Sequence, residues 1–436
     1  MSLSGSQKMP EKLYNPLILM VLMALGGCVT NPVTGQSEVG FVSTAQQIAI
    51  GEEQYVPAQQ MQGGRYVVDP ELTEYVEEVG QRVAAHSNIN LPYEFVVLNS
   101  SVPNAWALPG GKLAINRGLL VELRNEAELA AVLGHEVVHA AARHGAKQIE
   151  RGMLLQGALV ATAIGVQGSG LGNTVMQSAQ MAASLVNTKY GRDAEREADF
   201  YGTRMLAQAG YDPYAAVTLQ ETFLKLSEGR EPSWLEGMLA SHPPSSERVQ
   251  NNRGLVETLR GEGYTGGEYG SDRYQRAVRT IRDDKEAYAK ADQARQAFRE
   301  GDSGEALELV EAALAMQNAE PTFHALRGDI RYEQGRFGDA IINYNRAIER
   351  DDAFYGHYLG RGMSHVEQGN QTQAKADLNA SVELLPTTIA YLELGKIAEA
   401  EGNTDLASRY YQAAGQSEGP VGQEARARYA RLQGAG

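Results

Sequence analysis

The chain has 436 residues, 43% of them hydrophobic, a formal net charge of −15 and one cysteine. This is enough apolar material for two or three domains with their own cores. The acidic balance, without a visible basic stripe, argues against a nucleic-acid partner. The single cysteine excludes an internal disulfide.

The N-terminal stretch KMPEKLYNPLILMVLMALGGC has the pattern of a bacterial export signal. Lysines precede the apolar run Leu17–Leu25, which is too short to span a bilayer. Its end resembles a lipobox, which implies that Cys28 is acylated and becomes the mature N-terminus. The residue after Cys28 is Val29. An Asp at this position would retain the protein at the inner membrane, so we expect it at the outer membrane. We therefore predict a lipoprotein signal peptide over residues 1–27, a tether over 28–42, and a periplasmic location with a lipid anchor as the membrane contact.

A small sheet is predicted before the chain's main motif. The segment YEFVVLN, Tyr93–Asn99, alternates in the manner of a strand, and NAWAL and KLAIN flank the turn Pro109–Gly111.

The motif itself is GHEVVHAAARHG, which begins at Gly134. Asn125 followed by Glu128 resembles a capping box, and apolar residues then recur at helical spacing. On a helix, His135 and His139 share one face, a spacing that suits two imidazole ligands of zinc. Glu136 lies where a general base would act on a water at the fourth position. The competing interpretation is a core helix whose histidines are solvated or hydrogen-bonded.

A catalytic zinc site needs a third protein ligand. The continuation HExxHxxGxxH is absent, because Ala142 and Gly145 occupy its last two fixed places. His144 lies on the other side of the helix from His135 and is expected to pack or cap near the helix end. Downstream, GRDAEREADFYGTRM predicts a second helix on which Glu195 and Asp199 share a face.

We assign Glu195 as the third ligand and Asp199 as the acceptor that fixes a histidine tautomer. Taken alone, this segment would more often be a solvated acidic face in which Asp193, Glu195, Glu197 and Asp199 pair with Arg192 and Arg196. The HExxH motif upstream reverses that balance.

Four motifs in order, NAWALPGGKLAINRGLL, HEVVH, EREAD and SHPPSSERV, resemble the HtpX, Ste-type CAAX protease and BepA family of gluzincin metallopeptidases. The resemblance covers residues 43–253. It implies one Zn²⁺ per chain held by His135, His139 and Glu195, with Glu136 as the catalytic base.

The same resemblance implies that Asn104 and Ala105 belong to an edge strand that pairs with an extended peptide substrate. It gives His242 two competing roles: a fourth metal ligand that keeps the enzyme latent, or, with Arg248, a stabiliser of the oxyanion. The sequence leaves both roles open.

Between the two predicted helices that carry the ligands, Met153–Gly168 is predicted to form part of a mobile hairpin or lid.

After residue 253 the composition changes to Gly-rich and polar, and the chain then repeats. The glycines at 301, 335 and 369 are 34 residues apart, the one at 402 follows after 33, and the alanines at 306, 340, 374 and 407 keep the same intervals. This period is typical of tetratricopeptide repeats, which present a concave surface to polypeptide partners. Gly328, Gly362 and Gly395 occupy the small position of the first helix, and Tyr344 and Tyr411 the large position of the second.

The predicted fold is an α+β zincin-like domain, mainly helical with a small sheet, followed by an all-α repeat solenoid. The predicted boundaries are 43–253 for the zinc domain, 254–286 for a linker, 287–421 for four repeats and 422–436 for a tail.

The functional hypothesis is a lipid-anchored zinc endopeptidase that degrades or helps assemble unfolded or misassembled envelope proteins, with the repeats recruiting them or contacting the outer-membrane assembly machinery. The alternative is a repeat-based chaperone or scaffold whose metal site is structural or plugged by His242.

Overall fold

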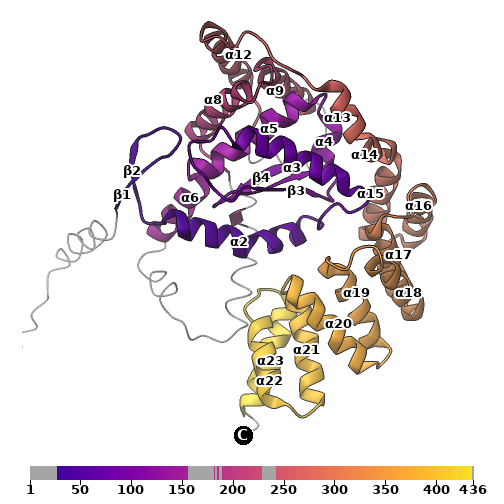
Figure 1. Cartoon of the computed structure of the whole chain (residues 1–436). Coiled ribbons are helices and arrows are strands. Elements are labelled where there is room, and N and C mark those ends of the chain that lie inside the picture. The colour runs from indigo at the N-terminus through magenta and orange to yellow at the C-terminus, as the bar shows by residue number, and fades with distance from the viewer. Residues whose placement is uncertain (1–26, 156–180, 182–183, 186–188, 228–241, 435–436) are drawn as a thin grey trace, which may run out of the picture.

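The computed structural model describes residues 27–155, 181, 184–185, 189–227 and 242–434. The predicted signal peptide therefore lies outside the described residues except for Gly27. The predicted lid lies outside them from residue 156 onward. The described chain is an α+β domain followed by an array of paired helices (Figure 1), which confirms the predicted fold class.

The predicted tether, residues 28–42, contains a β-hairpin. Its strands β1 (Gly27–Thr30) and β2 (Ser37–Gly40) pair antiparallel. Glu38 of β2 forms an ion pair of 2.8 Å with Lys147. The hairpin is therefore attached to the α+β domain.

The main sheet has three strands, β3 (Glu94–Leu98), β4 (Ala105–Leu108) and β5 (Lys112–Asn116). The central strand β5 runs parallel to β3 and antiparallel to β4, so β4 is an edge strand. Between β4 and β5, Gly110 and Gly111 have φ angles of 83° and 94°, a region that disfavours residues with a Cβ. This requirement explains the PGG turn.

The sheet lies between α2 (Thr44–Met61) on one face and α3 (Pro70–Ala84) and α5 (Glu126–Ala141) on the other (Figure 1). Side chains alternate along β3, because successive residues of a strand point to opposite faces. Val96 packs in the cluster that includes residues of α2, and Val97 packs in the cluster that includes α3 and α5.

The helix α8 (Arg192–Gln208) crosses α5 where Gly134 and Gly202 face each other. A Cβ at either glycine would meet the backbone of the opposite helix within 3.1 Å. The missing side chains therefore let two helices approach each other backbone to backbone, more closely than larger residues would allow.

Further helices complete the domain and continue into the predicted linker. Their bounds are α4 (Arg117–Glu122), α6 (His144–Leu155), α9 (Tyr214–Ser227), α12 (Ser246–Gly261), α13 (Ser271–Ala277) and α14 (Arg279–Asp283). Arg273 of α13 pairs with the buried carboxylate of Glu126, the first residue of α5. Residues 254–286 are thus largely helical and are held against the domain.

The C-terminal array consists of helices that pair in sequence order. They are α15 (Lys285–Arg299), α16 (Ser303–Met316), α17 (Pro321–Glu333), α18 (Phe337–Ile348), α19 (Tyr355–Glu367), α20 (Gln371–Leu384), α21 (Thr388–Ala400), α22 (Thr404–Ala414) and α23 (Pro420–Gly434). A Cβ at Gly328 would meet the Tyr344 ring at 2.9 Å, and one at Gly395 would meet the Tyr411 ring at 2.4 Å. The small and large positions predicted from the repeat therefore pack against each other. Residues 422–434 of the predicted tail lie within α23, and the last two residues lie outside the described part of the chain.

The array is docked on the α+β domain rather than merely joined to it. Asn99, just after β3, donates a 2.8 Å hydrogen bond to the buried carboxylate of Glu320. The Arg117 guanidinium lies 3.3 Å from the centre of the Tyr288 ring. At the end of α2, Gln60 donates to the carbonyl of Ala353 at 2.7 Å.

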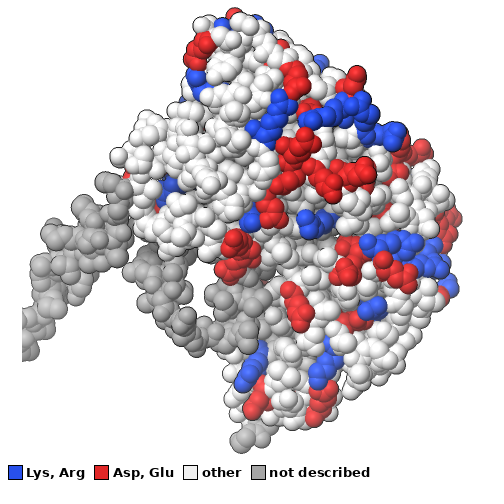
Figure 2. All heavy atoms as spheres, in the orientation of Figure 1, with Lys and Arg blue, Asp and Glu red and all other residues white. Residues whose placement is uncertain are grey.

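None of the helices in the described part of the chain combines the length and apolar character needed to cross a bilayer. Over the face shown in Figure 2, basic and acidic side chains are interspersed.

Candidate metal centre

The motif helix α5 begins largely as the sequence predicts. The Asn125 side chain accepts from the backbone N of Glu128 at 3.0 Å. The reciprocal half of the box is shifted by one residue, because the Glu128 carboxylate accepts from the backbone N of Arg124 at 2.8 Å. The cap sets the start of a helix that runs without interruption through His135 and His139.

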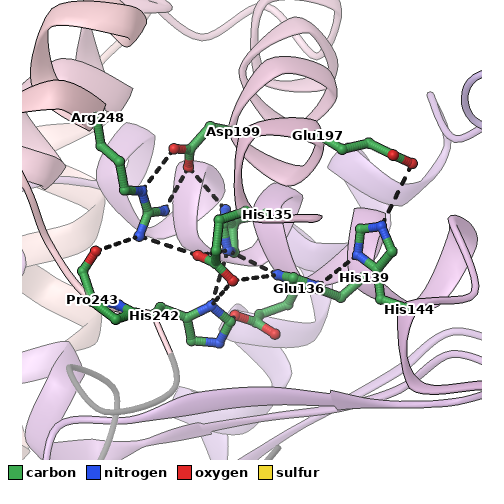
Figure 3. A network of polar contacts seen from close by, with 10 residues as sticks. His135, Glu136, His139, His144, Glu197, Asp199, His242, Pro243 and Arg248 are labelled. Atoms are coloured by element: carbon green, nitrogen blue, oxygen red, sulfur yellow. Dashed lines mark hydrogen bonds and ion pairs between the residues drawn. The ribbon is translucent and has the colours of Figure 1, made fainter. Parts of the chain in front are cut away.

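The predicted ligands converge on one point (Figure 3). The Nε2 atoms of His135 and His139 are 3.0 Å apart, and His242 Nδ1 lies 3.2 Å from His135 Nε2. Glu195 Oε1 is 3.5 Å from His139 Nε2 and 2.9 Å from His242 Nδ1. These atoms come from α5, from α8 and from the residue that precedes Pro243.

The donor set fits a tetrahedral cation. Zinc binds nitrogen and oxygen at about 2.0–2.2 Å, and a tetrahedron of that size separates its ligand atoms by about 3.3–3.6 Å. The separations between these side chains, 2.9–3.5 Å, extend from slightly below this range into it. Three imidazoles and one carboxylate bring several nitrogen and oxygen lone pairs this close to one another. A bound cation would be coordinated by these lone pairs. Together they form the one group of potential ligands found among the described residues.

Asp199 and Arg248 support the ligands from outside. Asp199 Oδ1 lies 3.1 Å from His135 Nδ1, as the tautomer-fixing prediction requires. The Arg248 guanidinium makes two hydrogen bonds to Asp199, of 2.8 and 2.7 Å, and lies 3.2 Å from Glu195 Oε2. The Arg248 side chain is therefore engaged with the two acidic groups of α8.

Glu136 lies next to the cluster without belonging to it. Its Oε1 is 3.5 Å from His242 Nε2, and its Oε2 is buried without a hydrogen-bond partner among the described residues. A buried carboxylate oxygen with no hydrogen-bond partner is costly to keep, so its presence calls for an explanation. It is placed to exchange a proton with a molecule bound at the cluster.

Two contacts of His139 were not foreseen from the sequence. His144, expected to pack or cap, opens α6 and brings its Nδ1 to 2.8 Å from the Nδ1 of His139. Tyr190 stacks on the His139 ring with centroids 4.0 Å apart and an angle of 19°. Tyr190 immediately precedes the GRDAEREAD segment, but nothing in that local sequence indicates that its ring stacks on a histidine more than fifty residues earlier.

Burial and neighbouring groups shift the pKa values of the ligand residues in different directions. Burial raises the pKa of Glu195, but the nearby histidines outweigh it and hold that pKa far below its ordinary value. Burial alone lowers the pKa of His135, whereas hydrogen bonds to Asp199 and Glu195 reverse this and raise it to about 10. Burial dominates at His139 and holds its pKa well below the ordinary value, so that ring is neutral and available as a ligand.

Comparison with known proteins agrees with this geometry. Residues 70–256 match the model of peptidase family M48, and residues 291–354 and 359–420 match a tetratricopeptide repeat model. The "Beta-barrel assembly-enhancing protease" of Escherichia coli is 28% identical over 80% of this chain and 75% of its own length. The "Mitochondrial metalloendopeptidase OMA1" of Arabidopsis thaliana is 36% identical over 38% of this chain and 32% of its own.

Among solved structures, the crystal structure of MamA is 18% identical and covers 40% of this chain and 96% of its own, with a TM-score of 0.29. That similarity is too low to bear on function. The family match spans β3 to β5, the histidine helix α5 and the Glu195 helix α8, and the repeat match spans most of the C-terminal array. The chain therefore carries a metallopeptidase domain of peptidase family M48 over residues 70–256, followed by tetratricopeptide repeats.

Proposed function

We propose that this protein is a zinc-dependent endopeptidase of the bacterial envelope that degrades or helps assemble unfolded or misassembled envelope proteins. The observation that supports it most is the convergence of His135, His139 and Glu195, with the unpartnered carboxylate of Glu136 beside them. A general base needs a carboxylate oxygen that can accept a proton, and Glu136 Oε2 accepts from no other donor among the described residues.

The chain's own groups suffice for peptide hydrolysis once the metal is bound. Zinc held by His135, His139 and Glu195 would acidify water and polarise the scissile carbonyl. Glu136 takes the proton of the attacking water on its carboxylate and delivers it to the leaving amine. Asp199 keeps a proton on His135 Nδ1, so that Nε2 faces the metal.

The substrate would bind as an additional strand along β4. Asn104 accepts from the backbone N of Asn116 at 2.8 Å, so the alternation of antiparallel pairs turns the backbone groups of Ala105 and Ala107 away from β5. An extended peptide could pair with these groups regardless of its side chains. Such pairing suits an enzyme whose substrates are unfolded segments.

His242 would hold the enzyme in a latent state. Its Nδ1 lies among the ligand atoms, 2.9 Å from Glu195 Oε1, at the place that the water of a catalytic site would take. Arg248 is committed to Asp199 and Glu195, which leaves the alternative oxyanion role without its second group. Departure of His242 would open the fourth position.

The tetratricopeptide repeats would recruit substrates or the outer-membrane assembly machinery. The contacts of Asn99 with Glu320 and of Arg117 with Tyr288 hold the first repeats against the loop that follows β3 and against the start of α4. A partner bound to the array would therefore be kept at a fixed position relative to the metal centre. A lipid on Cys28 would keep the whole assembly at the outer membrane.

Three measurements test this function. Metal analysis of the purified protein should find one zinc per chain. Wild type should digest casein slowly and His242→Ala should digest it faster, whereas Glu136→Gln should not digest it. Mass spectrometry of the membrane fraction should show a lipid on Cys28 that Cys28→Ala lacks. A scaffold with no protease function would instead cleave casein in neither wild type nor His242→Ala, while its partner binding would survive Glu136→Gln.

A further inference from the structure

His139 reaches beyond the metal cluster through a chain of polar side chains (Figure 3). Its Nδ1 lies 2.8 Å from His144 Nδ1, and His144 Nε2 faces Glu197 Oε1 at 3.6 Å. Glu197 in turn accepts a 3.0 Å hydrogen bond from the side-chain nitrogen of Asn31 in the N-terminal hairpin. The chain therefore runs from a metal ligand of α5 through α6 and α8 to the hairpin.

With a metal bound at His139 Nε2, the geometry of this series of side chains determines where its protons lie. A His139 that offers the Nε2 lone pair to a metal carries its proton on Nδ1 and must donate it. His144 Nδ1 must then accept, so a neutral His144 carries its proton on Nε2, the atom that faces the Glu197 carboxylate. Each group thus sets the tautomer of the one before it.

Asn31 has its orientation set independently. Its side-chain oxygen accepts from the backbone N atoms of Val33 and Thr34 at 2.9 and 3.3 Å. The amide nitrogen must therefore point the other way, toward Glu38 and Glu197. Asn31 is fully buried, whereas the Glu197 side chain is partly exposed.

The backbone turn that precedes His144 is also fixed by contacts of its own. The preceding residue, Arg143, has a φ of 63°, an unusual value for a residue with a Cβ, and this turn separates α5 from α6. Its guanidinium donates to the carbonyl of Val42 at 2.8 Å and to Glu150 at 3.0 Å. Glu150 also accepts from the backbone N of Phe41 and of Val42, both at 2.9 Å. The segment after β2 thus braces the corner that carries His144.

We infer that His144 is a positioning residue for the metal site: it accepts the Nδ1 proton of His139, and Glu197 with the hairpin residue Asn31 holds it in the accepting tautomer. This inference rests on the proposed metal site and assigns part of it to the N-terminal hairpin. Asp199 serves His135 in the same way, so each of the two motif histidines has its own acceptor.

The test compares His144→Leu with His144→Asn. Leucine removes the acceptor, whereas the side-chain oxygen of asparagine can stand near the position of the histidine Nδ1. Zinc affinity is measured by competition with a chromogenic chelator. Loss of an outer partner of this kind typically weakens metal binding about 10- to 100-fold, which we expect for His144→Leu, with recovery in His144→Asn. Asn31→Ala should weaken binding in the same direction but less.

A matched control is His357→Leu. His357 is fully buried in α19, and neither of its ring nitrogens has a hydrogen-bond partner among the described residues. This exchange removes a buried histidine far along the chain and should leave zinc affinity unchanged. Equal zinc affinity in wild type and His144→Leu would overturn the inference, as would an asparagine variant as weak as the leucine variant. A wild type that binds no zinc would refute the proposed metal site as well.

A second measurement needs no variant and guards against misfolding of His144→Leu. In zinc-loaded protein labelled with ¹⁵N-histidine, nitrogen shifts should report His139 protonated on Nδ1 and His144 protonated on Nε2 alone. A proton on His144 Nδ1 would leave no acceptor for His139, and the inference would fail.

Discussion

Gly202 of α8 faces His135 of α5 so closely that a Cβ on the glycine would lie 2.9 Å from the His135 backbone nitrogen. The neighbour is backbone, which cannot rotate out of the way. This contact sets the separation of the two helices that carry the motif histidines and Glu195.

Gly202→Ala should therefore force α8 away from α5. Overpacking of this kind costs on the order of 1–3 kcal/mol, and it should move Glu195 relative to His135 and His139. We expect a lower unfolding temperature together with weaker zinc binding. The control is Gly254→Ala in α12, where a Cβ would meet nothing within 4 Å. Unchanged zinc affinity in Gly202→Ala would show that the crossing does not set the ligand geometry.

Glu136→Gln should abolish cleavage and leave the metal bound. The amide keeps the shape of the side chain but cannot take a proton from water, and loss of general base catalysis costs about 10²- to 10⁴-fold in rate. Casein turnover and zinc content are measured on the same preparation. Retained turnover would exclude Glu136 as the base.

His242→Ala should raise casein turnover, because the Nδ1 atom that occupies the fourth ligand position is removed. The remaining ligands, His135, His139 and Glu195, are the three that a catalytic zinc site requires. Zinc affinity should fall modestly as one donor is lost. A lower turnover at unchanged zinc content would instead assign His242 to transition-state stabilisation.

Glu126→Gln should destabilise the protein at neutral pH. Burial raises the pKa of Glu126, but hydrogen bonds from Arg273, Tyr211 and Tyr75 outweigh it and hold that pKa below the ordinary 4.5. A carboxyl whose pKa is depressed on folding stabilises the protein above its unfolded pKa, and this contribution is lost as the pH falls through its folded pKa. We expect the free energy of unfolding of Glu126→Gln at pH 7 to be about 2 kcal/mol lower than that of wild type.

The difference in the free energy of unfolding between the two proteins should narrow progressively as the pH drops below 4.5. Below that pH the wild-type carboxyl becomes protonated and is then neutral like the Gln side chain. Thermal unfolding of both proteins across this pH range measures this difference. The matched control is the same exchange at Glu74, an exposed residue of α3. A difference that stays constant with pH would mean that the charge of Glu126 does not contribute.

Much of the metal centre could be predicted from the sequence because pairs of its residues lie four positions apart on a single helix. Helical periodicity places His135 and His139 on one face, and it does the same for Glu195 and Asp199 on α8. The repeat period likewise predicted the C-terminal array, since each unit obeys the same packing rule, as the contacts of Gly328 with Tyr344 and of Gly395 with Tyr411 show. Such patterns survive in the sequence because every turn of a helix repeats the same geometry.

Other features were decided only by the tertiary structure. His144 contacts His139 because Arg143 adopts a positive φ and ends the helical period that would have turned His144 away. Asn31 reaches Glu197 across 166 positions of the chain, and Asn99 reaches Glu320 across 221. No periodicity links such distant positions. Their contacts depend on how whole helices and the hairpin pack, and that packing follows from the sum of many weak interactions rather than from a local pattern.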